Sequence, residues 1–243
     1  MGKSANRQVR QGDMRRQTIR WARGFLLAVL VVALVAGVMA TWPSARGAAP
    51  MVGGVRLFGA LFPLAGRHIG IVAGHSGSDA GAVCPDGLTE AQVNLAIAEA
   101  VVREVEARGA TADLLAEFDE RLSGYRADAF VSIHADSCEV DLSGYKVAGL
   151  EDARNSASAR LVECLWREYE RATGLPRHPD TITYDMSQYH AFREIAGTTP
   201  AAIIEIGFLK ADRDLLTRQP QRVAAGIVAG IECFLQNREQ GGR

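Results

Sequence analysis

Cysteine is scarce in this sequence, and its four residues stand far apart. They are Cys84, Cys138, Cys164 and Cys233, so no Cys-x-x-Cys pair occurs in the chain. Cysteine-type zinc sites use such closely spaced pairs, and their absence argues against a site of that type. The sequence also has no internal repeat and no low-complexity tract. This favours one folded domain of ordinary size over an array of repeats.

Net charge is also almost absent, at −1 at pH 7, but it is unevenly distributed. Residues 1–23 carry seven Lys or Arg and one Asp, a net charge of +6, which leaves −7 for the remainder. A basic tail of this kind can bind nucleic acid. Here an uncharged run, 24–45, follows it, and 25–40 is nearly all apolar. That context argues against a nucleic-acid partner.

The uncharged run has the features of a membrane helix. Trp21 and Trp42 bracket it, and a helix between them would span about 30 Å, the thickness of the hydrocarbon core. Cations on one side predict a cytoplasmic N-terminus. We therefore expect 1–23 to be a basic cytoplasmic tail and 24–42 a transmembrane signal anchor. The rest of the chain would lie on the extracytoplasmic side of the cell membrane.

The alternative is a signal peptide that is cleaved, which would give a secreted protein. The apolar region of a signal peptide is about 7–15 residues long, shorter than the run seen here. Small residues at 45–49 would nevertheless permit cleavage. In both cases the rest of the chain is exported.

Beyond the apolar run the sequence divides into a linker, 43–66, rich in Pro and Gly, a domain, 67–237, and a short tail, 238–243. Within the domain we expect strands at 69–72, 111–115, 129–133, 144–148, 181–184 and 201–204, and helices at 88–108, 118–126, 156–173 and 219–235. Strands that alternate with helices indicate the α/β class. We predict a single three-layer domain with a mostly parallel sheet and helices on both faces.

Three of the expected strands are followed directly or closely by a residue that can bind a metal. These are His75 after 69–72, His134 after 129–133, and Glu205 after 201–204. In a parallel sheet these strand ends lie at one edge, where α/β proteins keep their sites. A lone histidine after a strand is more often a structural residue, and His68 fits that description.

A fourth such residue, Glu90, stands at the start of the helix expected at 88–108. Thr89 is a good N-cap, and Gln92 completes a capping box. Two His and one Glu form a catalytic zinc set with an open position for water. The remaining Glu can then act as general base.

The segments around these residues resemble the zinc-dependent N-acetylmuramoyl-L-alanine amidases of the amidase-3 type, a family of cell-wall enzymes. The matching pieces are VAGHSG at 72–77, GLTEAQVN at 87–94, SIHADS at 132–137 and IEIGF at 204–208. The resemblance extends over roughly 67–237, in family order. Two departures are visible, GHSG for the usual GHGG and HAD for the usual HAN. Neither changes a ligand, so they bear on substrate fit more than on chemistry.

The resemblance implies roles for these residues and a reaction. His75, Glu90 and His134 would bind one Zn²⁺, and Glu205 would be the catalytic base. The reaction would be hydrolysis of the amide between the lactyl group of N-acetylmuramic acid and L-alanine of the stem peptide in peptidoglycan. It would serve cell-wall remodelling or daughter-cell separation. The alternatives are another zinc-dependent peptidoglycan peptidase, and a non-catalytic wall-binding protein, which the complete residue set disfavours.

Three further residues are candidates for the substrate pocket. His178 and His190 could also bind the metal in place of the histidines above. Both lie in loop sequence rich in Pro and Tyr, so they could instead line the substrate pocket or lie on the solvated surface. Arg193 precedes the last expected strand and could hold an acidic substrate. We take Arg193 and His190 as candidate substrate contacts.

The exported context permits disulfides. Cys84 lies in the first metal loop, and Cys138 follows His134 by four residues, so we expect a disulfide between them. Cys164 and Cys233 lie within helices beside Leu165 and Phe234, and we expect both to be buried thiols. The alternative is four free thiols.

Some amidases of this type carry an inserted helix that covers the zinc until an activator binds. Here the interval between the expected strand and the next helix is 148–155, which is too short for a helix with its own linkers. We therefore expect no requirement for an activator protein. The resemblance implies peptidoglycan or muropeptides as the substrate.

Overall fold

The computed structural model describes residues 62–150 and 156–240, which lie in one compact unit. The strands are β1 His68–Ala73, β2 Thr111–Leu115, β3 Ala129–Asp136, β4 Lys146–Ala148 and β5 Ala201–Phe208. The helices are α3 Glu90–Ala107, α4 Ser156–Thr173, α5 Tyr184–Ser187, α6 Ala191–Glu194, α7 Arg213–Arg218 and α8 Pro220–Gln240, with 3₁₀ turns η1 Glu120–Leu122 and η2 Pro179–Thr181. The expected tail 1–23 and membrane helix 24–42 lie outside the described residues. Within the described ranges, no helix is long and apolar enough to cross a membrane.

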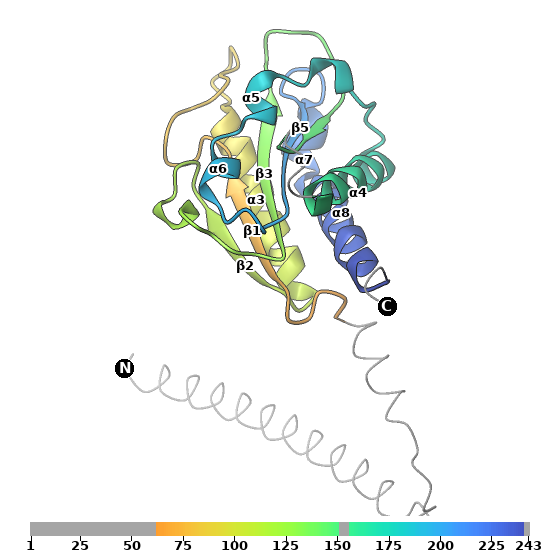
Figure 1. The fold of residues 1–243 in the computed structure, drawn as a ribbon. Coiled ribbons are helices and arrows are strands. Elements are labelled where there is room, and N and C mark those ends of the chain that lie inside the picture. The colour runs from red at the N-terminus through yellow and green to blue at the C-terminus, as the bar shows by residue number, and fades with distance from the viewer. Residues whose placement is uncertain (1–61, 151–155, 241–243) are drawn as a thin grey trace, which may run out of the picture. The chain divides into compact units, whose positions relative to one another are not determined.

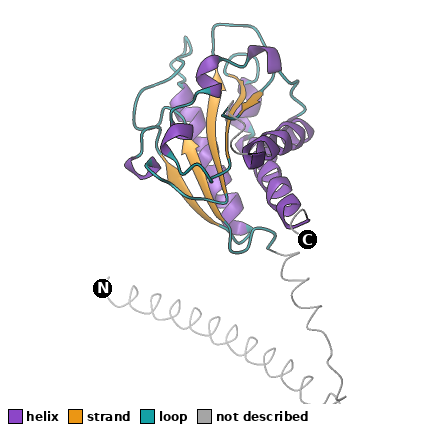
Figure 2. Cartoon of the chain, in the orientation of Figure 1, coloured by secondary structure: helices purple, strands orange, loops and turns teal. Residues whose placement is uncertain are grey.

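The five strands form one sheet in the order β2-β1-β3-β5-β4 (Figures 1 and 2). The four neighbouring strands β2, β1, β3 and β5 are parallel, and the edge strand β4 is antiparallel to β5. A mostly parallel sheet in an α/β domain is therefore confirmed. The parallel strands bring their carboxyl ends to one edge of the sheet, which is the arrangement expected for the residues that follow these strands.

The two faces of this sheet are covered differently. The long helices α3, α4 and α8 all pack on one face, over a core that includes Ile71, Val131 and Ile204. On the other face, Phe130 and Ile203 pack against the short α5–α6 segment, including Met186 and Phe192. The expected helices on both faces are therefore present, but those on the second face are single turns.

Two predicted elements, a strand and a helix, are wrong. In both places a side chain caps a short helical turn, and this turn forms in place of the predicted element. Residues 181–184 are not a strand, because the Thr183 hydroxyl accepts a hydrogen bond from the Met186 amide and starts α5. Residues 118–126 are not a helix. Asp119 caps a single 3₁₀ turn there, and Gly124, at φ 69°, follows it in a left-handed conformation.

Both pairs of cysteines form disulfides. The Cys84–Cys138 pairing is confirmed, with a Cα–Cα distance of 5.3 Å. The expectation of two free thiols is wrong, because Cys164 of α4 is bonded to Cys233 of α8. The two helices lie close enough for this because α8 presents a glycine to α4. A Cβ at Gly230 would stand 2.7 Å from a Leu165 methyl carbon.

Candidate functional site

Alternation along the strands decides which face carries the polar strand ends. In β3, Val131 and Ile133 point to the long helices, so His134 shares the opposite face with Phe130. In β5, Glu205 lies by the same alternation on the face of Ile203. His134 and Glu205 are paired in the register of these parallel strands. Their side chains therefore lie side by side beneath the α5–α6 segment.

His75 reaches the same place from the turn after β1. Its φ of 63° is the only positive φ of a residue other than glycine among the described residues. Such a conformation costs free energy and persists only where the surroundings impose it. The preceding residue must be glycine, because a Cβ on Gly74 would lie 2.4 Å from the His134 ring. The turn after β1 therefore packs directly against the carboxyl end of β3.

Glu90 enters from the first position of α3. Thr89 and Gln92 form the expected capping box, which fixes where the helix begins. The carboxylate oxygens of Glu90 accept hydrogen bonds from the backbone amides of Ala82 and Ala135. Asn94, one turn further along α3, donates to Glu90 at 3.2 Å and to the Gly74 carbonyl at 3.1 Å. The side chain of Glu90 is therefore held on every side.

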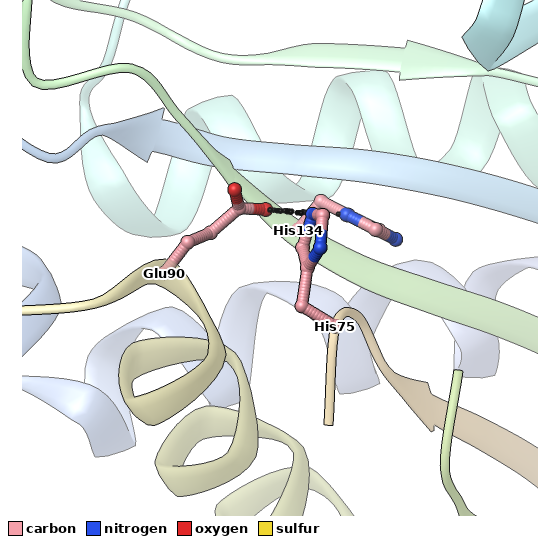
Figure 3. Close-up of side chains that lie close together, drawn as sticks. All are labelled: His75, Glu90 and His134. Atoms are coloured by element: carbon pink, nitrogen blue, oxygen red, sulfur yellow. Dashed lines mark hydrogen bonds and ion pairs between the residues drawn. The ribbon is translucent and has the colours of Figure 1, made fainter. Parts of the chain in front are cut away.

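These three residues form one compact set of donor atoms (Figure 3). Glu90 Oε1 lies 3.2 Å from His75 Nε2 and 3.2 Å from His134 Nδ1. The ligand atoms of the three residues all lie within 4.8 Å of one another. It is the only such group of His, Cys, Asp and Glu found in the described part of the chain.

The charges of this set are strongly coupled. The hydrogen bond to Glu90 raises the pKa of His75 to about 9. Burial opposes charge on His134 and on Glu90. Even so, their mutual contact raises the pKa of His134 and lowers the pKa of Glu90. A bound cation would replace the protons on the two imidazoles and keep the carboxylate ionised.

Glu205 has a different environment from Glu90. Burial raises the pKa of its carboxyl to about 7, and the neighbouring charge of His134 opposes that increase. Its Oε2 is shielded from solvent and has no hydrogen-bond partner among the described residues. An unpartnered buried carboxyl oxygen beside a cluster of metal-binding side chains is typical of a functional group.

The residues present fit a zinc ion. Two imidazole nitrogens and one carboxylate oxygen are a common catalytic donor set, and tetrahedral bonds of about 2.0–2.1 Å place such ligand atoms roughly 3.3 Å apart. Two of the observed separations are 3.2 Å. Gly81 preserves the space, because a Cβ there would stand 2.6 Å from Glu90 Oε2.

The stretch 69–233 matches the family model described as N-acetylmuramoyl-L-alanine amidase, of the Amidase_3 type. The chain belongs to this amidase family. Two curated proteins are similar to the chain in sequence. The uncharacterized protein YqiI of Bacillus subtilis is 29% identical over 185 residues, which cover 71% of this chain and 86% of YqiI. The N-acetylmuramoyl-L-alanine amidase AmiC of Neisseria meningitidis serogroup B is 32% identical over 152 residues, 56% of this chain and only 36% of AmiC.

Solved structures of amidases show the same fold. The CwlD amidase of Clostridioides difficile, solved in complex with the GerS lipoprotein, is 25% identical with a TM-score of 0.56, and the match covers 70% of this chain and 99% of CwlD. AmiC2 of Nostoc punctiforme is 28% identical with a TM-score of 0.52, over 70% of this chain and 97% of AmiC2. The chain is a peptidoglycan amidase.

Two side chains at this candidate site are missing from the residues that the sequence indicated. Asn94 follows Glu90 by four residues on α3, and that spacing places both on one helix face. Glu117 follows β2 by two residues and is buried against His75 and His134. Because β2 is also a parallel strand, the rule that identified the other strand ends could have found Glu117.

The candidate substrate residues of the amidase are dispersed. His178 contacts the Ser143 carbonyl at 2.7 Å beside the edge strand. Both ring nitrogens of His190 are engaged, with Glu117 at 3.0 Å and Glu194 at 2.8 Å. Arg193 is exposed on α6. Asp136, which makes the motif HAD where the family usually has HAN, forms an ion pair at 2.5 Å with the buried Lys146.

Proposed function

We propose that this amidase is a zinc enzyme and that one Zn²⁺ per chain is held by His75, Glu90 and His134. The observation that carries the proposal is the convergence of these three side chains beside Glu205, from three different elements and in the family's order. Zinc bound there would supply Lewis acidity toward the amide carbonyl and the attacking water. The bond cut would join the lactyl group of N-acetylmuramic acid to L-alanine.

Glu205 is the proposed general base. It would take a proton from the attacking water and deliver it to the nitrogen of the leaving L-alanine amine. Burial raises the pKa of this carboxyl above its usual range, which makes the carboxylate a better proton acceptor for the first of these steps.

The amide specificity is the part of the proposal that needs a direct experiment. A zinc carboxypeptidase acting on the wall would use the same donor set, whereas a wall-binding protein would not need Glu205. Purified peptidoglycan digested with the chain should release stem peptides that carry a free L-alanine amine, as seen by mass spectrometry. Shortened stems that are still attached to sugar would identify a peptidase instead, and unchanged sacculi would identify a binding protein.

We also retain two proposals about context. The run at 24–42 would hold the domain at the extracytoplasmic face of the membrane, and the two disulfides support an oxidising compartment. Because both nitrogens of His190 already contact carboxylates, only Arg193 remains as a proposed substrate contact. Protease protection of the domain in intact cells, compared with permeabilised cells, tests the membrane orientation.

A further inference from the structure

We infer that Glu117 is a positioning residue that holds both histidines of the metal site in place. The inference rests on the proposed function only in that it requires the metal to bind at His75, Glu90 and His134. Glu117 comes from the loop after β2 and lies beside the His75 amide and His134 Nε2, whereas Glu90 faces the other ring nitrogen of His134.

The first contact is with the backbone of His75. The His75 amide donates to Glu117 Oε2 at 2.8 Å, and the Glu117 amide donates to the Ser76 carbonyl at 3.0 Å. These two bonds clamp the turn at the residue that has the positive φ. A left-handed histidine needs such a constraint, since the conformation is unfavourable by itself. Glu117 therefore helps to impose the conformation that aims His75 at the site.

The second contact is with the far ring nitrogen of His134. His134 Nδ1 faces Glu90, which leaves Nε2 as the atom that carries the ring proton when a metal occupies Nδ1. Nε2 is buried and has no hydrogen-bond partner among the described residues, and the carboxylate within ion-pair distance of it is Glu117, whose Oε2 lies at 3.5 Å. A carboxylate behind a metal-binding histidine fixes its tautomer and ring orientation and makes the nitrogen that binds the metal a better donor.

His75 shows the same arrangement with another carboxylate. Its Nδ1 lies 2.7 Å from Asp79, while its Nε2 faces Glu90. Asp79 is exposed, whereas the Glu117 side chain is only 7% exposed. Glu117 is thus the protected member of the pair and the only one of the two that touches both histidines.

Glu117 is itself held in place. His190 Nε2 lies 3.0 Å from its Oε1, and Glu194 holds the other nitrogen of the His190 ring. Tyr189 packs edge-on against the His134 ring, and its hydroxyl accepts a hydrogen bond from Ser132. The α5–α6 segment therefore acts as a cover that keeps Glu117 aligned with the histidines, which gives His190 a role in the site without contact to substrate.

The test compares zinc binding in Glu117→Gln with that of the wild type, using the full-length chain. Gln keeps the shape but removes the negative charge and one of the two acceptor oxygens beside His75, His134 and His190. We expect the zinc dissociation constant, measured by competition with a chromophoric chelator, to rise 10- to 100-fold. The visible spectrum of the cobalt-substituted variant should also change. The matched control is Glu232→Gln, which removes a carboxylate paired with Arg108 at the far end of α3 and should bind zinc as the wild type does.

The outcomes separate the inference from the proposed function. If the wild type does not bind zinc at this site, the proposed function fails. If wild type and Glu117→Gln bind zinc equally and give the same cobalt spectrum, the inference alone is overturned.

A second measurement does not depend on the folding of a variant. In the zinc-loaded wild type, NMR should show a slowly exchanging proton on His134 Nε2, shifted downfield by Glu117. A proton that exchanges freely with solvent, or a metal bound at Nε2, would refute the positioning role.

Discussion

Replacing Glu205 by Gln separates the proposed base from the proposed metal ligands. The side chain keeps its shape and its place opposite His134, but it loses the ability to accept a proton. General-base catalysis contributes about 10²–10⁴ in rate, equivalent to roughly 2.7–5.4 kcal/mol of activation free energy. We therefore expect kcat to fall by two to four orders of magnitude while zinc remains bound at one per chain.

The pH dependence sharpens this prediction. Glu205 accepts a proton only when ionised, so activity should be lost as pH falls through its pKa. Burial sets that pKa at about 7, and a bound cation would lower it. The wild-type kcat/KM should therefore rise with pH along a limb whose midpoint lies at or below about 7. This limb should be missing from Glu205→Gln.

The assay is release of stem peptide from dye-labelled peptidoglycan, with zinc quantified by mass spectrometry on the same samples. The wild-type Oε2 is already buried without a partner, so the new amide replaces one unpartnered polar group by another at a position where packing affects folding stability. Thermal unfolding must therefore be measured first, and the assay run well below the transition. A variant that keeps most of its rate would show that another residue is the base. A variant that loses its zinc would make Glu205 a ligand.

The remaining predictions concern protons, disulfides and control. Because Glu90 raises the pKa of His75 to about 9, zinc binding at pH 7 should release protons, and the affinity for zinc should increase as pH rises toward 9. Calorimetry in buffers of different ionisation enthalpy measures the proton release. A zinc affinity that does not change with pH would contradict the prediction. Non-reducing peptide mapping should find both disulfides. Reduction of each disulfide should lower the free energy of unfolding, measured by urea denaturation, by roughly 2–4 kcal/mol. Complete alkylation of the four cysteines in the unreduced chain would be inconsistent with the structure. The fragment 51–243 should hydrolyse soluble muropeptides without a second protein, although the related CwlD was solved with a lipoprotein; turnover that begins only when another protein is added would reveal an occluding element.

The sequence alone determined the parts of the site that depend on local signals. An apolar strand followed by a polar residue placed His75, His134 and Glu205 at one sheet edge, because parallel strands share the direction of their carboxyl ends. The capping box at Thr89 placed Glu90 at the start of α3. These signals are short-range, and the structure brings His75, Glu90 and His134 together, with Glu205 paired opposite His134.

Tertiary packing decided what local signals leave open. The Cys164–Cys233 bond spans 69 residues and exists because α4 and α8 approach closely, which neither helix reveals by its own sequence. Residues 181–184 have strand-forming side chains, but the Thr183 cap makes them part of the cover over the site. Glu117 is a loop carboxylate in the sequence. It becomes part of the candidate site only when folding buries it against two histidines and gives its charge a backbone hydrogen-bond donor in place of water.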